Sequence, residues 1–365
     1  MKIINRLIIN LPSRKRLSYN WNFGSLLGII LIIQILTGIF LSFFYAPNII
    51  ISFDCLNYII RDVNFGWLFR IIHLNLASFF FLFVYFHIAR GMFFNSNRLA
   101  HTWGSGVTIY IILIATAFIG YVLPWGQISL WGATVITNFL STIPILGETI
   151  VKWIWGGFSV NNSTLNCFFS IHFILPFVLL VFVIIHLIFL HYTGSTTPSL
   201  GSFRNNIKIK FDNYYIYKDI INIVIIFIII FLTIFSPFIV GDPENFILAN
   251  PMNSPIHIQP EWYFLYIYGI LRSIPNKLGG VIVIVLALVI FYFIILNNKI
   301  IFLNTFFSYK FIYFLFLNCF LLLTWIGSQA VEDPFIFTGQ ILTFLYFLYF
   351  IWIFIYNEFL FFIFK

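Results

Sequence analysis

Two stretches of equal length decide the fold: HLNLASFFFLFVYFH at residues 73–87 and HFILPFVLLVFVIIH at residues 172–186. Each is an apolar run that begins and ends with histidine. Together with their apolar flanks, both runs are long enough to cross a bilayer as a helix. An interval of 14 residues is about 3.9 helical turns, so the two histidines of each stretch lie on nearly one face, about 21 Å apart along the axis.

The rest of the chain has the same apolar character. Of its 365 residues, 61% are hydrophobic and only 8% are charged, and the mean hydropathy is +1.02. Because soluble domains are about 25% charged, a water-soluble fold is excluded. Apolar runs bounded by charge, Pro or Gly predict an all-α membrane protein with eight transmembrane helices, at about residues 21–44, 65–93, 101–122, 165–192, 219–236, 279–297, 309–326 and 336–360.

The pattern predicts three parts. Residues 1–20 form a basic interfacial segment, residues 21–205 a four-helix bundle, and residues 206–365 the remaining four helices. Two long connections lie on the same side: one, rich in Trp and Gly, follows the third helix, and the other, rich in Pro, follows the fifth. Both are predicted to contain interfacial helices. Most of the 19 Lys and Arg residues fall on the other side. Since positive loops stay on the side of insertion, both termini are expected on the negative side of the membrane.

The paired histidines predict a metal cofactor. A single intramembrane histidine is commonly a hydrogen-bonded core residue. Two pairs at the same spacing on two helices favour axial ligation of haem iron at two levels of the bundle, and hence an electron path between the two membrane faces. The four ligands are His73, His87, His172 and His186.

Glycine and arginine follow the same pattern. Gly24 and Gly38, and likewise Gly106 and Gly120, repeat the 14-residue interval, and glycine lets a flat ring approach a helix backbone closely. Arg70 and Arg90 lie near opposite ends of one histidine helix. Because haem propionates are anionic, we expect these two arginines to bind them.

Several longer motifs carry a resemblance to a known family. They are WGQISLWGATVITNFL (125–140), HFILPF (172–177), HLIFLHYTGS (186–195), GDPENF (241–246), PEWYFL (260–265) and LRSIPNKLGG (271–280). Over about residues 15–360 the chain resembles mitochondrial cytochrome b. The resemblance implies two non-covalent haem b groups with bis-histidine ligation. The low-potential haem lies on His73 and His172 near the positive side, and the high-potential haem on His87 and His186.

The resemblance also implies an activity and a setting. The chain is expected to be the catalytic subunit of ubiquinol–cytochrome c oxidoreductase, which oxidises ubiquinol near the positive side and reduces ubiquinone near the negative side in the Q-cycle, contributing to a proton gradient. It implies the mitochondrial inner membrane, with both termini in the matrix. The implied partners are the Rieske iron–sulfur protein, cytochrome c1, other complex III subunits, a second copy of the complex and membrane lipid. Basic residues are not interleaved with exposed stacking aromatics, so nucleic-acid binding is not expected.

Two quinone sites follow from the resemblance. At the quinol-oxidation site, Glu261 is expected to accept a proton because burial raises a carboxyl pKa. Its expected companions are Pro260, Trp262, Tyr263, Gly132, Phe118 and Tyr121. At the quinone-reduction site the expected residues are His191, Asp219, Ser195 and Ser25. The chain departs from the common pattern at Tyr192, Asn166 and Cys167, which puts proton uptake and partner contacts in question.

Two other classes remain open. A di-haem membrane anchor subunit of a quinone-linked dehydrogenase also uses paired histidines, although it gives no reason for the PEWY segment. A transporter or channel explains the apolar bulk but predicts paired ionisable residues along a pore. Haem spectra and their response to quinol-site inhibitors separate these classes.

Overall fold

Eight long helices dominate the computed structural model, which describes residues 12–15, 17–196, 208–212, 214–296 and 306–363. Among these residues, eight helices are long and apolar enough to span a membrane, as predicted. Helices of 17 to 32 residues span about 25–48 Å, which matches a hydrocarbon core of about 30 Å. They are α2 (Phe23–Ser42), α4 (Gly66–Phe93), α5 (Ala100–Val122), α8 (Asn162–Thr193), α9 (Tyr215–Phe235), α11 (Lys277–Phe293), α12 (Phe307–Gly327) and α13 (Phe335–Ile363).

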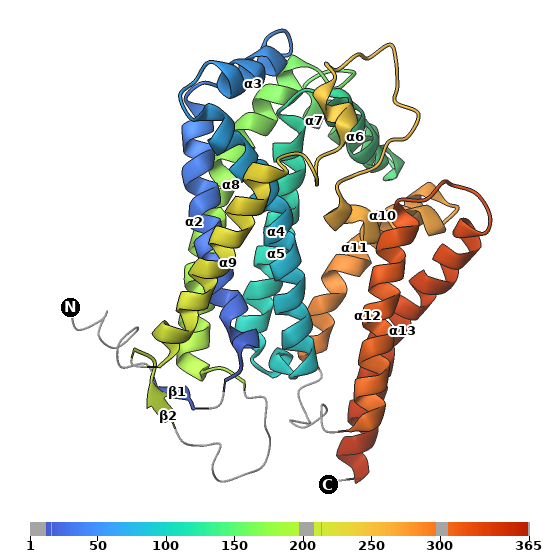
Figure 1. Ribbon diagram of the computed structural model, residues 1–365. Coiled ribbons are helices and arrows are strands. Elements are labelled where there is room, and N and C mark those ends of the chain that lie inside the picture. Colours follow the sequence, from blue (N-terminus) through green and yellow to red (C-terminus); the bar gives the residue numbers. More distant parts are fainter. Residues whose placement is uncertain (1–11, 16, 197–207, 213, 297–305, 364–365) are drawn as a thin grey trace.

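Shorter helices lie in the connections. Three of them, α3 (Ser52–Arg61), α6 (Gln127–Asn138) and α7 (Gly147–Trp155), lie together at one end of the molecule (Figure 1). The fourth, α10 (Leu265–Ser273), follows the proline-rich connection after α9. Helices in both long connections were predicted, whereas α3 was not.

The first four spanning helices form a bundle. α2 packs against α4, and α5 packs against α8. The buried centre of this bundle includes Leu26, Leu76 and Phe81, all nearly inaccessible to solvent. α9 packs against α2 and α4 and lies beside this bundle, apart from the later helices (Figure 1). The predicted division at residues 205 and 206 grouped this helix with the later ones, and it stays a prediction.

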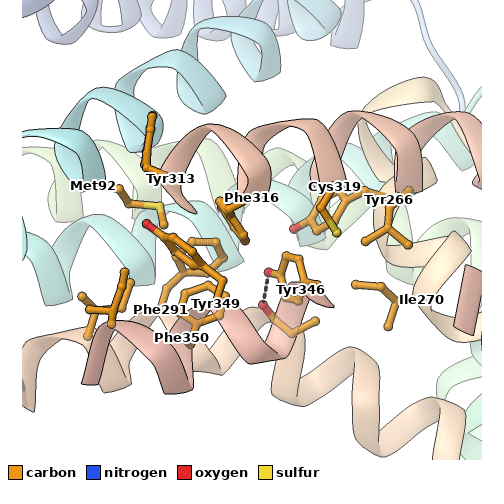
Figure 2. Packing of buried hydrophobic residues seen from close by; sticks show 14 of the residues in the cluster. Met92, Tyr266, Ile270, Phe291, Tyr313, Phe316, Cys319, Tyr346, Tyr349 and Phe350 are labelled. Carbon is orange, nitrogen blue, oxygen red and sulfur yellow. Dashed lines mark hydrogen bonds between the residues drawn. The ribbon is translucent and has the colours of Figure 1, made fainter. Parts of the chain in front are cut away.

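An aromatic core holds the last helices together. Tyr346, fully buried on α13, donates its hydroxyl hydrogen bond to the carbonyl of Ala287 on α11 (3.0 Å; Figure 2). Phe316 of α12 stacks on Tyr349 of α13 with ring centroids 4.1 Å apart. Tyr266 of α10 belongs to the same cluster. Buried phenol hydroxyls need partners, and those of Tyr346 and Tyr266 find them on neighbouring helices, at Ala287 and Tyr110.

This core also joins the two groups of helices. Met92, Trp103 and Val107, from α4 and α5, belong to the cluster shown in part in Figure 2. The Trp103 indole nitrogen donates to the carbonyl of Phe291 on α11 (2.8 Å). The first bundle is therefore fixed against α11 by packing and by a buried hydrogen bond.

A short antiparallel ribbon lies at the other end. Strand β1 (Pro12–Arg14) pairs with β2 (Lys208–Lys210), and the C-terminal end of α13 lies at this same end (Figure 1). The predicted interfacial segment 1–20 falls partly outside the described residues. Within the described part, Pro12–Arg14 is extended and Tyr19–Asn22 forms a 3-10 helix that leads into α2.

Candidate functional site

The four intramembrane histidines form two facing pairs. His73 of α4 and His172 of α8 have ring centroids 6.3 Å apart, and His87 and His186 on the same two helices have centroids 6.4 Å apart. Two imidazoles that share one first-row metal ion at about 2 Å per bond place their centroids about 6 Å apart. The pairs therefore have the spacing of axial ligands. No group of three or more His, Cys, Asp or Glu side chains poised for a metal occurs in the described part of the chain.

Polar neighbours orient the rings of His73 and His172. Thr37 Oγ1 lies 3.0 Å from His73 Nδ1, and the carbonyl of Thr116 lies 2.9 Å from His172 Nδ1. Both oxygens can accept a hydrogen bond from the protonated Nδ1. A donor–acceptor pair of this kind fixes the tautomer and leaves Nε2 free to bind a metal.

The second pair has one similar neighbour and one different one. Ser105 Oγ lies 3.1 Å from His186 Nδ1, and Arg90 Nη2 lies 3.1 Å from His87 Nδ1. A guanidinium only donates hydrogen bonds, so this contact makes His87 Nδ1 an acceptor. Arg90 Nε is buried without a hydrogen-bond partner, although its guanidinium also lies over the ring of Trp21 at 5.3 Å. Arg90 thus has donor capacity left for an anionic group.

Each predicted glycine contacts one histidine ring. A methyl group at Gly24 would lie 3.6 Å from His87 Cε1, one at Gly38 would lie 3.2 Å from His73 Cε1, and one at Gly106 would lie 3.2 Å from His186 Cε1. At Gly120 it would collide with the ring of His172. The 14-residue glycine spacing on α2 and α5 therefore matches the histidine spacing on α4 and α8 in space as well as in sequence.

Two cavities meet at the His73–His172 pair. One, of about 730 Å³, extends towards α2 and α3, and the other, of about 900 Å³, extends towards the interior of the bundle. Both are lined by His73, His172, Gly120 and Arg70. Space on both sides of an imidazole pair, with an arginine on the wall, fits a flat anionic ring held by its central metal.

A third cavity lies beside Glu261. It has a volume of about 500 Å³, and its walls come from α5, α6 and the segment before α10. Five of the seven residues expected here line it, namely Phe118, Tyr121, Gly132, Pro260 and Glu261. Tyr263 lines the cavity next to the histidines and stacks on Phe81 at 4.2 Å, while Trp262 lies against Tyr85 with centroids 6.4 Å apart. Glu261 lines both cavities and so forms part of the wall between them.

Burial changes the acid strength of Glu261. The pKa of this carboxyl is raised to about 7, mainly by loss of hydration. A hydrogen bond with Tyr121 opposes the rise, and the negative charge of Asp242 adds to it. The Oε1 of Glu261 is buried without a partner. A carboxyl with this pKa exchanges a proton near neutral pH, which suits an acid or base.

A set of hydrogen bonds fixes the two long connections against each other beside this pocket. We call it the pocket latch: residues Trp125–Ser129 on one side and Asn245–Asn253 on the other. Asn245 Oδ1 accepts from the backbone nitrogen and the hydroxyl of Ser129 (3.0 and 2.9 Å). Gln127 donates through Nε2 to the carbonyl of Asn253 (2.9 Å) and accepts through Oε1 from the backbone nitrogen of Asn250 (2.8 Å).

Backbone contacts complete the latch. Gly126 pairs with Leu248 as an antiparallel bridge, and a Cβ at Gly126 would collide with Asn245. Trp125 has a φ of +56°, a conformation that costs a non-glycine residue about 1 kcal/mol or more. The latch thus holds residues 245–253 against the start of α6. Leu248 in this segment lies twelve residues before Pro260 in the sequence.

The residues expected at the other membrane side lie on three helices. Ser25 of α2 donates its hydroxyl to Asp219 Oδ1 of α9 (2.8 Å). His191 is half-buried in the last turn of α8, and Ser195 follows that helix. The start of α2, the end of α8 and the start of α9 lie at the same end of the molecule (Figure 1).

The departures from the common pattern lie at surfaces. Tyr192 is 91% exposed, and Cys167 is exposed near the start of α8. The Asn166 amide donates to the carbonyl of Pro47 (2.9 Å) and so ties α8 to the segment before α3. The remaining histidines, His101 and His257, contact Phe189 and Gln259.

Several supporting residues have no sequence signal of their own. Thr37, Ser105 and Thr116 contact histidine rings, but hydroxyl residues are common in membrane helices. The latch residues Gln127 and Asn245 belong to quoted motifs, yet their pairing joins positions more than 100 residues apart.

The fold and the site together define a polytopic helical membrane protein whose four-helix bundle presents facing imidazole pairs for a haem-type cofactor. The comparisons with known proteins agree. Residues 8–194 match the family model "Cytochrome b/b6/petB", and residues 248–347 match "Cytochrome b(C-terminal)/b6/petD". The chain therefore belongs to the cytochrome b family, in which haem b is the bound cofactor.

Two relatives illustrate the match. A curated cytochrome b of Apis mellifera ligustica is 54% identical over 349 residues, which are 94% of this chain and 90% of that protein. A chain of the solved structure titled "Hyperthermophilic respiratory Complex III" is 31% identical and superposes with a TM-score of 0.89, covering 99% of this chain and 96% of that one.

Proposed function

We propose that this chain is the electron-transferring and quinone-reactive subunit of a respiratory complex III, with two haem b groups held by four histidines. One observation carries the proposal: four histidines form two pairs with the spacing of axial ligands, and each of the four rings lies next to a glycine of a neighbouring helix. When bound, the haems would carry single electrons between the two ends of the bundle.

Different residues would bind different parts of the two haems. His73 and His172 would hold the group nearer the end where α3, α6 and α7 lie, and His87 and His186 the other. Arg70 and Arg90 would bind the propionates. For His87 to bind a metal through Nε2, its Nδ1 must carry the proton, so Arg90 must turn away from that nitrogen. An anionic propionate gives the guanidinium a better partner.

We assign ubiquinol oxidation to the pocket of Phe118, Tyr121, Gly132, Pro260 and Glu261. Glu261 would accept a quinol proton, because its pKa of about 7 leaves it partly ionised at neutral pH. Tyr263 and Trp262 would support the wall towards the haem. The latch would keep that wall in place while a partner docks.

We assign ubiquinone reduction to the region of His191, Asp219, Ser25 and Ser195. The Asp219 carboxyl, held by Ser25, would in its protonated form donate a hydrogen bond and then its proton to the quinone, taking up a new proton from the aqueous side, and His191 would donate a second hydrogen bond. Proton release at one face and uptake at the other would contribute to a proton gradient.

The assembly follows from the same assignment. We infer a mitochondrial inner-membrane protein with both termini in the matrix, working with a Rieske iron–sulfur protein, cytochrome c1 and other subunits in a dimeric complex. Support comes from the "Complex III" title of the superposed structure and from the position of β1 and the end of α13 at the same end of the molecule (Figure 1).

The test is a reduced-minus-oxidised spectrum with redox titration on the purified complex. We expect two b-type components in the parent chain. His73→Leu should remove the low-potential component and His87→Leu the high-potential one, while His101→Leu, whose ring lies against Phe189, should retain both. A spectrum unchanged by the first two variants would refute the assignment. Haem bands that do not respond to quinol-site inhibitors would favour a dehydrogenase anchor. A colourless purified chain would favour a transporter.

A further inference from the structure

A buried asparagine next to Asp219 has no part in the assignment above. Asn222 lies one helical turn after Asp219 on α9, so the two side chains share a face. It is 1% exposed, and its Oδ1 has no hydrogen-bond partner. An unpaired buried carbonyl is costly, so packing alone would favour an apolar residue here.

The amide group of Asn222 makes two contacts with the start of the α2 segment. Its Nδ2 donates to Ser25 Oγ (2.9 Å) and to the carbonyl of Asn22 (3.3 Å). The Asn22 side chain in turn donates to the carbonyl of Lys218 (2.8 Å). Asn222 is thus part of the contact between α9 and α2.

These two contacts decide where the Ser25 proton goes. A serine hydroxyl has one proton, and Ser25 has two acceptors within reach, Asp219 Oδ1 at 2.8 Å and the carbonyl of Asn22 at 3.0 Å. Asn222 donates to that competing carbonyl and also fills a lone-pair position of Ser25 Oγ. Both effects favour donation from Ser25 to Asp219.

We propose that Asn222 is a positioning residue of the quinone-reduction site, which acts through Ser25 to hold the Asp219 carboxylate in one orientation. With Oδ1 of Asp219 accepting from Ser25, its other oxygen would carry the proton that is exchanged with the quinone. This inference rests on the proposed function, because it assumes that Asp219 serves quinone reduction.

The experiment measures electron entry from quinol in the purified complex, with the pocket at Glu261 blocked by an inhibitor. Reduction of the haem assigned to His87 and His186 in a single turnover is followed against ubiquinol concentration. The limiting rate constant, written kcat below, and the half-saturating concentration, written KM, are thus obtained separately. Asn222→Leu removes both donations and keeps the volume similar. We expect kcat to fall roughly two- to tenfold, the range for one hydrogen bond, with KM nearly unchanged.

A double variant separates positioning from a general structural effect. Because Asn222 acts through Ser25, the pair Ser25→Ala with Asn222→Leu should be no slower than Ser25→Ala alone. Asn222→Asp, which has nearly the same shape, should also lower kcat, since a carboxylate accepts the Ser25 proton instead of directing it to Asp219. Thr233→Val is the matched control: Thr233 is buried on the same helix, but its hydroxyl binds the carbonyl of Ile230 in its own helix.

The outcomes distinguish this inference from the site assignment. An unchanged kcat in both Asn222 variants, or losses from Asn222→Leu and Ser25→Ala that multiply, would overturn the positioning role. Asp219→Asn and His191→Leu test the site itself. If these two variants leave the reaction intact, the proposed quinone-reduction site is wrong; if they abolish it while Asn222→Leu does not alter it, only the positioning role is wrong.

Discussion

Replacing Glu261 with glutamine gives the sharpest test of the proton chemistry. Burial raises the pKa of this carboxyl from 4.5 to about 7, which corresponds to about 3 kcal/mol against ionisation at 1.36 kcal/mol per pH unit. A base acts only when it has lost its proton. With a pKa of about 7, roughly a tenth of the Glu261 carboxyls are ionised at pH 6 and about nine-tenths at pH 8.

The expected result is a pH-dependent step in quinol oxidation. In the parent complex, kcat/KM for ubiquinol should rise several-fold between pH 6 and 8, whereas a glutamate with an ordinary pKa of about 4.3 would give no rise in that range. Glu261→Gln should lower the rate and remove this step. Steady-state reduction of cytochrome c over this pH range is the assay.

A matched acid at the same end of the molecule provides the control. Glu148 on α7 is exposed and lies 3.7 Å from Lys152, so Glu148→Gln should leave both the rate and the pH profile unchanged. A Glu261→Gln complex that kept the full pH-dependent step would refute the role of Glu261 as the titrating base.

Two further predictions concern the haem contacts and the latch. Gly38→Ala places a methyl group 3.2 Å from Cε1 of His73, which forces that imidazole to move by a few tenths of an ångström, so the haem component assigned to His73 and His172 should change in potential or amplitude. Gly28→Ala, which meets no atom within 4 Å, should leave both components unchanged; identical redox titrations of the two variants would contradict the close-contact argument. Asn245→Leu leaves the Ser129 backbone N–H without its acceptor, although the Ser129 hydroxyl keeps the carbonyl of Tyr121. An unpaired buried donor costs about 1–3 kcal/mol, so the KM for quinol should rise and thermal stability fall with haem spectra intact. Asn253→Ala keeps the carbonyl that the latch uses and should behave like the parent chain; an Asn245 variant with unchanged quinol kinetics would show that the latch does not shape the pocket.

The spanning helices were predictable because a single physical signal determines them. A helix predicted at 65–93 begins at Gly66 and ends at Phe93, and one predicted at 336–360 extends over Phe335–Ile363. In lipid every backbone polar group must be bonded within the segment, so a long apolar run has one stable conformation. The histidine pairing was predictable for a related reason, because equal intervals on two helices bring their faces into register.

Shorter elements depend on contacts that sequence does not display. α3 has ten residues of mixed polarity, too few for a clear helical period, and its Ile59 becomes buried only through tertiary packing. Trp262 belongs to the PEWY motif but lines none of the three described cavities, and its ring lies against Tyr85 instead. The latch was not predictable, since its hydrogen bonds join side chains and backbone groups that are more than 100 residues apart in the sequence.

The 14-residue interval also describes the twist of the bundle. Fourteen residues are two heptads. A pattern that repeats every seven residues keeps the same faces of neighbouring helices in contact when the helices wind around each other with a left-handed twist. All four helices of the first bundle carry this interval, α4 and α8 in histidine and α2 and α5 in glycine. The two histidine levels are therefore two layers of the bundle that lie two heptads apart, and at each level both imidazoles lie next to a glycine of a neighbouring helix.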